Sequence, residues 1–133
     1  MSAPDDRRAA TPADLNRPLE NERLLCALDD IADGGSRGFP APPGGFIGLF
    51  AVRRGEAVFV YVNSCPHVGL PLEMQPHRFL DEAGERIICA AHGATFRVED
   101  GMCMAGPCEG EGLETVPARI EAGGVYVPAK AGL

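Results

Sequence analysis

The chain has 133 residues, of which 45% are hydrophobic and 23% charged, and this composition predicts one globular domain rather than a disordered chain. Its 19 acidic and 12 basic residues give a formal net charge of −7, and Lys130 is the only lysine, so a basic surface for nucleic acid is excluded. The apolar runs are far shorter than the roughly 18 residues of a membrane-spanning helix, which excludes a membrane span.

Residues 1–22 are predicted to form a flexible tail, because they combine three prolines and many charges with few large apolar side chains. No apolar stretch follows Arg7 and Arg8, so an export signal is not expected and we predict a cytoplasmic, reducing location. In that compartment the five cysteines are expected to be metal ligands or core residues rather than disulfides. Residues 23–133 then form a single folded domain.

Strand patterns dominate this domain, and its 17 glycines and 12 prolines favour short strands joined by turns over long helices. Helical spacing is limited to one short turn within residues 72–80, which Pro71 and Pro76 restrict. The pattern predicts an all-β sandwich or small barrel. The predicted strands are residues 23–28, 46–52, 57–62, 86–89, 94–98, 113–120 and 125–127, and the predicted turns are residues 53–56, 100–101 and 121–124.

Two short motifs that pair a cysteine with a histidine follow predicted strands. The first is Cys65-Pro66-His67 and the second is Cys89-Ala90-Ala91-His92, with 21 residues between them. Two of the three histidines therefore lie beside a cysteine, and a glycine follows each motif, where a backbone amide can approach a cluster sulfur. This arrangement predicts a metal site whose ligands are Cys65, His67, Cys89 and His92.

The chemistry of these ligands leaves two metals open. Two thiolates and two imidazoles suit a tetrahedral zinc ion, and they equally suit a binuclear iron–sulfur cluster in which each motif gives one ligand to each iron. A Cys-x-His motif is unusual for zinc, whose motifs are typically two cysteines spaced by two to four residues. We therefore favour the iron–sulfur cluster and keep zinc as the alternative.

The two motifs resemble the Rieske-type [2Fe–2S] domain, and specifically the small soluble Rieske ferredoxins. The resemblance runs from about residue 24 to residue 127, and the turn at residues 99–101 and the pair Gly106-Pro107 match further family features. It implies an antiparallel β-sandwich with a small cluster-binding subdomain at about residues 63–110. It also implies that Cys65 and Cys89 hold the inner iron, and that His67 and His92 hold the outer, solvent-facing iron.

The sequence departs from the family pattern in three places. The spacer between the motifs is long, and we expect Gln75 to Glu85 to form a surface excursion that carries partner specificity. Leu70 and Ala91 stand where high-potential members carry two bridging cysteines, so that disulfide is absent. Ala94 and Phe96 stand where those members place hydroxyl groups near the cluster.

The missing hydroxyl groups predict a low reduction potential. Hydrogen bonds to cluster or ligand sulfur stabilise the reduced state and raise the potential. Residues 65–114 also carry nine carboxylates against three arginines, which makes reduction harder. We expect a midpoint potential near the low end of the Rieske range, at about −150 mV.

Other reactive or charged residues have simpler interpretations. Cys103 and Cys108 form either a disulfide or, as we favour, two reduced thiols that pack the loop. Cys26 is expected in the core, His77 on the surface, and Arg53-Arg54 in a solvated turn. Met102 and Met104, which flank Cys103, are expected to shield the cluster from water.

The resemblance implies a one-electron carrier that accepts an electron from a reductase and passes it to an oxygenase or other terminal enzyme. The edge formed by His67 and His92 is the expected transfer surface, and the acidic balance suits partners with basic docking patches. We expect no catalytic activity of its own, since no substrate pocket or general base is recognisable. The alternatives are a small iron–sulfur subunit of a larger, nitrite-reductase-like oxidoreductase, and a zinc-stabilised interaction module without a redox role.

Overall fold

The computed structural model describes residues 21–41, 47–66, 71–73, 75–90, 93–106 and 110–131. Within these residues the chain forms ten strands and one short 3-10 helix, so the all-β prediction is confirmed. The elements are β1 (Glu22–Ala27), η1 (Leu28–Asp30), β2 (Ser36–Phe39), β3 (Leu49–Arg54), β4 (Ala57–Val62), β5 (Arg86–Ile88), β6 (Thr95–Arg97), β7 (Cys103–Ala105), β8 (Thr115–Val116), β9 (Arg119–Glu121) and β10 (Gly124–Pro128).

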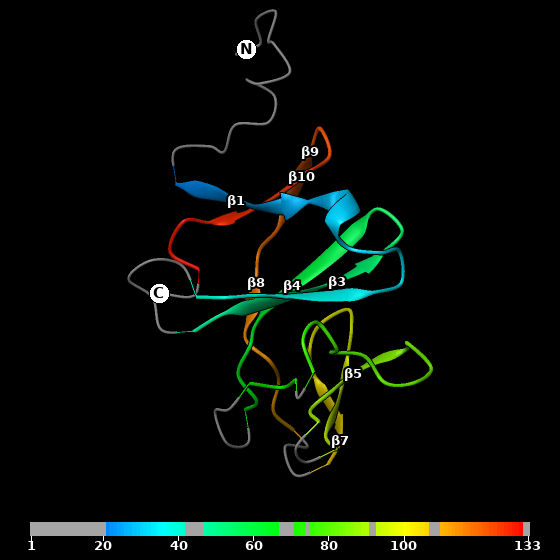
Figure 1. Ribbon diagram of the computed structural model, residues 1–133. Helices are drawn as coiled ribbons and strands as arrows, with labels where there is room; N and C mark the ends of the chain where they lie inside the picture. The colour runs from blue at the N-terminus through cyan, green and yellow to red at the C-terminus, as the bar shows by residue number, and fades with distance from the viewer. Residues whose placement is uncertain are drawn as a thin grey trace, which may run out of the picture.

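The strands form three antiparallel sheets that are stacked as layers (Figure 1). The upper sheet has the strand order β1-β10-β9, the middle sheet β2-β3-β4-β8, and the lower sheet β5-β6-β7. The lower sheet is formed by residues that follow the first Cys–His motif in the sequence, and its strands have three residues each. The middle sheet therefore lies between the upper and the lower sheet.

The middle sheet is buried on both faces, and strand β3 shows why. Leu49 and Ala51 pack into the core that the middle sheet shares with the upper sheet. Phe50 and Val52 alternate with them and pack into a second core on the lower side. All four side chains have an exposed fraction of 0%. Because successive side chains of a strand point to opposite faces, an unbroken apolar run is what a strand between two layers requires.

Several predicted strands are confirmed, and the differences have local causes. Strand β4 has the predicted bounds. The predicted strand at 113–120 is two strands, β8 and β9, because Pro117 lies between them and cannot donate a ladder hydrogen bond. Strands β2 and β7 and the helix η1 were not predicted, since their short sequences carry no apolar alternation. The residues of β2 are Ser-Arg-Gly-Phe, and they are ordered by pairing with β3.

The predicted solvated turn at Arg53-Arg54 is wrong. The two arginines pair with β4 residues, and the turn consists of Gly55 and Glu56 alone. The Arg53 guanidinium donates to the carbonyl of Ile31 at 2.9 Å, and that of Arg54 donates to a carbonyl in the turn before β5. Their guanidinium groups offer several donors in one plane, so they tie loops to the middle sheet instead of pointing into water.

The predicted surface excursion at Gln75 to Glu85 is only partly exposed. Phe79 at its centre is fully buried and stacks on Phe50, with ring centroids 4.4 Å apart and an interplanar angle of 3°. His77 is exposed, as expected, and its Nδ1 accepts the backbone N–H of Gly38 at 3.0 Å. The segment therefore covers the open edge of β2 and contributes to the lower core.

Candidate metal centre

The two expected cysteine ligands lie in the same core. Cys65 follows β4 and is 0% exposed, while Cys89 follows β5 directly and is 1% exposed. Both belong to the apolar cluster between the middle and lower sheets. The structure thus brings together two residues that are 24 positions apart in the sequence.

The other two expected ligands, His67 and His92, lie outside the described residues, so their assignment stays a prediction. Within the described part of the chain, no group of three or more histidine, cysteine or acidic side chains gathers as a metal site. The geometry that bears on the site is therefore that of the two cysteines and of the backbone around them.

A tight turn holds the second cysteine. The N–H of Cys89 donates to the carbonyl of Ala94 at 2.8 Å, and the N–H of Gly93 donates back to the carbonyl of Cys89 at 2.8 Å. Gly93 has a φ of +72°, a left-handed conformation that glycine adopts without strain. These bonds join the two ends of the connection between β5 and β6, with Cys89 at its start.

The loops that bear the two cysteines are bonded to each other. The N–H of Ala90, next to Cys89, donates to the carbonyl of Leu72 at 2.9 Å. Leu72 closes the loop that begins with Cys65, and its side chain is fully buried. A backbone hydrogen bond therefore joins the two regions from which the four ligands are expected.

A third segment packs on the second cysteine turn. A Cβ atom placed on Gly106 would lie 2.7 Å from the Cα of Ala94, so only glycine fits there. This close approach brings the end of β7 against the turn that Cys89 begins. The neighbouring residues 107–109, which include Cys108, lie outside the described residues, so the state of the Cys103–Cys108 pair is not tested.

The surroundings of the two thiols suit an iron–sulfur cluster. Soft thiolates bind iron in such clusters, and an apolar shell limits water access and tunes the potential. The core that both cysteines share is mostly apolar, and the hydroxyl of Tyr61 in it donates to the carbonyl of Val98. Its fully buried apolar side chains include Leu72, Phe79, Ile87, Ala94 and Phe96. Met102 and Met104 are 39% and 37% exposed, so their role as a water shield stays a prediction.

Two polar contacts hold the far end of the lower sheet. The Tyr61 hydroxyl, on β4, donates to the carbonyl of Val98, and burial raises the pKa of Tyr61 well above its usual range. Asp100, in the turn after β6, accepts from the Arg97 guanidinium and from the N–H of Met102, and these bonds lower its pKa to about 2. Both contacts fix the turn that joins β6 to β7.

Cys26 differs from the cysteines of the lower core. It is 8% exposed and packs in the upper core, so its predicted place as a plain core residue is confirmed. Burial, with a smaller contribution from Asp30, raises the pKa of its thiol to about 11. A thiol of this kind stays protonated at neutral pH and is a poor metal ligand.

Comparison with known proteins identifies the family. Residues 23–119 match the family model of the Rieske [2Fe–2S] domain. The chain is 31% identical over 103 residues to the ferredoxin component of the p-cumate 2,3-dioxygenase system of Pseudomonas putida, covering 77% of this chain and 81% of that protein.

Solved structures agree with this assignment. The chain is similar to the ferredoxin of Sphingomonas yanoikuyae B1, with 26% identity and a TM-score of 0.60, covering 81% of this chain and 98% of that one. It is also similar to a chain in the complex of reduced oxygenase and oxidized ferredoxin of carbazole 1,9a-dioxygenase, with 25% identity and a TM-score of 0.66, covering 83% of this chain and 94% of that one.

The chain belongs to the Rieske [2Fe–2S] domain family of iron–sulfur proteins, and its antiparallel sheets and buried cysteine pair agree with that assignment. Within that family it is a ferredoxin: an electron carrier that holds a [2Fe–2S] cluster and exchanges electrons with protein partners, without catalysing a reaction alone. The alternative of a zinc module without a redox role is therefore excluded. In the described residues no helix has the length and apolar character needed to cross a membrane.

Proposed function

We propose that Cys65 and Cys89 bind the inner iron of the cluster and that His67 and His92 bind the outer iron. The observation that carries this proposal is the burial of both cysteines in one core, on loops joined by the bond from Ala90 to Leu72. In this arrangement each motif contributes one thiolate and one imidazole, and the imidazoles are the ligands nearest to a docking partner.

The proposed domain division follows from the ligand set. Residues 63–110 form the cluster-binding subdomain, within a domain of residues 23–133 that is preceded by a tail of residues 1–22. In support, β5, β6 and β7 all lie within residues 63–110 and pair only with one another among the named strands. Residues 1–20 of this tail lie outside the described residues, and its last residue, Glu22, begins β1.

The protein's own residues keep the site ready for electron transfer. The cluster, when bound, takes up and releases one electron. The apolar walls of the lower core would exclude water from the thiolate side, and the backbone bonds at Cys89 restrain that ligand. A site that does not reorganise between oxidation states needs less energy to transfer an electron.

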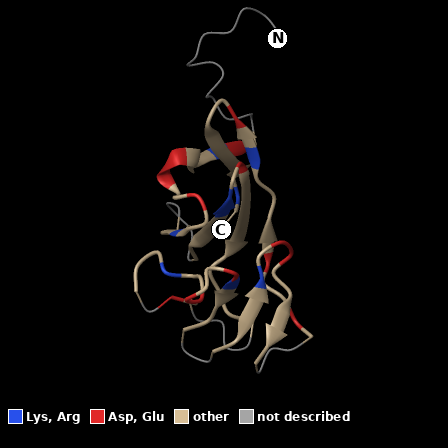
Figure 2. Ribbon diagram, turned by 90° about the vertical axis from the view of Figure 1, so that its right-hand side faces the viewer, with Lys and Arg blue, Asp and Glu red and all other residues tan. Residues whose placement is uncertain are grey.

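The proposed partners are a reductase that donates the electron and the oxygenase component of a dioxygenase system that accepts it. Support comes from the similarity to the ferredoxin component of such a system in Pseudomonas putida. Figure 2 shows acidic residues spread over all three layers, in keeping with the formal net charge of −7. An acidic carrier suits short-lived, salt-sensitive docking to basic patches. The location that we propose for it is the cytoplasm.

The partner proposal is tested with the reductase and oxygenase components of the p-cumate system as probes. We expect the reductase to bleach the visible absorbance of the cluster and the oxygenase component to restore it, with rates that fall as salt is raised. A chain that isolates from its natural host only in a stable complex with a large catalytic subunit contradicts the free carrier and supports the nitrite-reductase-like alternative.

The absence of hydroxyl groups at Ala94 and Phe96 leads to the proposed potential. Both side chains are fully buried in the core that contains the cysteines, and neither can donate a hydrogen bond to sulfur. We expect a midpoint near −150 mV in a redox titration followed by electron paramagnetic resonance (EPR). A midpoint above about +150 mV at neutral pH contradicts the proposal.

A further inference from the structure

The side chain of Asn63 closes the loop that carries Cys65. Asn63 follows β4 directly and lies two residues before the cysteine. Its Oδ1 accepts the backbone N–H of Leu72 at 2.9 Å, and its Nδ2 donates to Oε1 of Glu73 at 2.9 Å. Both polar atoms of the amide are therefore used, and both partners lie at the far end of the same loop.

The same contacts reach the second cysteine. The peptide unit of Leu72 that accepts from Ala90 is adjacent to the one that Asn63 holds. The path from Asn63 through Leu72 to Ala90 begins two residues before Cys65 and ends one residue after Cys89. One side chain thus fixes the element to which both cysteine loops are attached.

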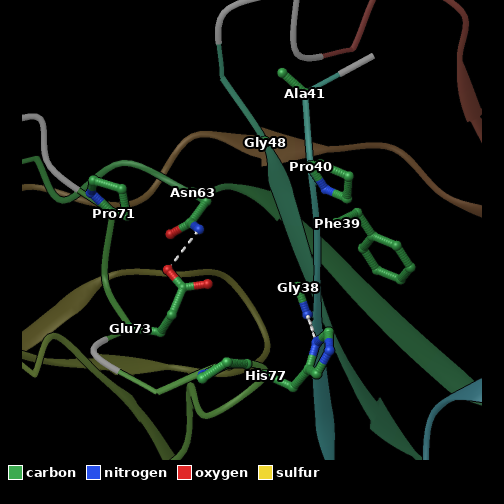
Figure 3. Close-up of a pocket in the computed structure, with 10 residues that line it drawn as sticks. Gly38, Phe39, Pro40, Ala41, Gly48, Asn63, Pro71, Glu73 and His77 are labelled. Atoms are coloured by element: carbon green, nitrogen blue, oxygen red, sulfur yellow. Dashed lines mark hydrogen bonds between the residues drawn. The ribbon is translucent and has the colours of Figure 1, made fainter.

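Asparagine is the residue type that this position requires. An amide supplies one acceptor and one donor in a fixed plane, whereas a carboxylate supplies acceptors only. Figure 3 shows the Asn63 and Glu73 side chains pointing toward each other at the wall of an open pocket of about 540 Å³. An aspartate at position 63 would face the carboxylate of Glu73, and like charges at hydrogen-bond distance repel each other.

We propose that Asn63 is a positioning residue for the cluster, which sets the Cys65 sulfur relative to the Cys89 sulfur at the inner iron. The inference rests on the proposed ligand set, in which these two thiolates share one iron. Asn63 itself binds no metal. Its loss is expected to leave the three-layer fold in place, because its backbone N–H still donates to the carbonyl of Gly48.

The decisive experiment compares four forms of the full-length chain, purified without oxygen. Asn63→Ala removes both side-chain bonds. The double substitution Asn63→Asp with Glu73→Gln exchanges donor and acceptor, so both bonds can form again while the net charge stays the same. Asn21→Ala is the matched control, because that exposed residue lies next to β1 at the opposite end of the molecule. Wild type is the reference.

Each form is measured for iron per chain, for the rate at which a chelator bleaches the cluster, for the EPR spectrum of the reduced state and for the midpoint potential. We expect Asn63→Ala to lose its cluster roughly tenfold faster than wild type, since two hydrogen bonds are removed. Its EPR spectrum and midpoint potential are expected to shift, which a purely structural role in the fold would not cause. The exchanged pair is expected to return all three quantities toward wild type, and Asn21→Ala to match wild type.

Two results overturn the inference. One is an Asn63→Ala protein whose cluster-loss rate, EPR spectrum and potential equal those of Asn21→Ala. The other is an exchanged pair that behaves like Asn63→Ala, because restored hydrogen bonds would then have no effect. A wild-type chain that binds no iron would contradict the ligand set itself, and the two failures are thereby told apart.

Discussion

The upper and lower layers of this protein are held together in different ways. In the upper layer, β1 pairs with β10 over five residue pairs, and the core beneath is formed by strand side chains. In the lower layer the strands have three residues each, and side chains from outside the sheet, among them Asn63 and Tyr61, bond its loops. Both layers pack apolar side chains against the middle sheet, but the upper layer adds longer strand pairing, whereas the lower layer adds side-chain hydrogen bonds to its loops.

Removing a cysteine ligand is the most severe way to test this difference. Cys89→Ala is expected to lose both irons, because a thiolate of the inner iron is missing, and to loosen the lower sheet while the upper sheet persists. Iron analysis and amide hydrogen exchange measure the two effects. His77→Ala is the control, since His77 bonds to Gly38 and is not among the proposed ligands, and it should keep two irons. A Cys89→Ala protein that retains two irons contradicts the account.

The aromatic contact between the middle and lower layers gives the next largest effect. Phe79→Ala removes a fully buried ring that stacks on Phe50, and we expect a loss of about 3–5 kcal/mol in the free energy of unfolding. Denaturant titration of the holoprotein measures it. Leu24→Ala in the upper layer, where the side chain is 49% exposed, should change stability by about 0.5 kcal/mol or less. Equal losses of stability at the two positions would contradict the burial of Phe79 in the core.

The two tyrosines sharpen the comparison with a single-atom change. Tyr61→Phe removes the hydroxyl that donates to the carbonyl of Val98, and leaving that buried acceptor unpaired should destabilise the protein by about 1–3 kcal/mol. In the upper layer, the buried hydroxyl of Tyr126 has no hydrogen-bond partner among the described residues. Tyr126→Phe is therefore expected to be neutral or stabilising. Thermal unfolding of both variants tests the contrast, and the reverse order of effects would contradict it.

The smallest effect concerns the upper-layer cysteine and appears only at alkaline pH. Burial raises the pKa of Cys26 to about 11 from an unfolded value of about 9. Because the folded pKa is the higher one, the protonated thiol stabilises the fold below pH 9, and this contribution is lost as the pH rises through 11. Unfolding midpoints at pH 7 and pH 10 should therefore differ more for wild type than for Cys26→Ala. Rapid alkylation of native Cys26 at pH 8 would contradict the raised pKa.

How far the sequence predicts the fold differs from strand to strand, even within the middle sheet. The unbroken apolar run of β3 and the alternation of β4 are visible in the sequence, because burial on one or both faces imposes a pattern. Strand β2 shows no such pattern, because it is ordered by its pairing with β3 and by the hydrogen bond from the N–H of Gly38 to His77. The burial of Phe79 was missed because the extra length of the spacer suggested a surface excursion.

The sequence predicts the ligands of the candidate site, but it does not predict the hydrogen bonds that hold the two cysteine loops. The spacing of the two Cys–His motifs indicates a shared metal centre, and the burial of Cys65 and Cys89 in one core agrees with it. The contacts of Asn63 and the bond from Ala90 to Leu72 have no signature in the sequence, because they join residues through tertiary packing. A polar residue two positions before a cysteine does not by itself indicate a positioning role, and only the structure shows which groups Asn63 contacts.

The ligand set is the central claim, and nitrogen coupling at the reduced cluster tests it most directly. The chain has three histidines, so in His77→Ala only His67 and His92 remain. Pulsed EPR of that variant, reduced by one electron and grown with ¹⁵N-labelled histidine, should show coupling to two imidazole nitrogens bound to iron. A cluster without histidine coupling, or a variant that has lost its cluster, would contradict the assignment of Cys65, His67, Cys89 and His92 as the four ligands.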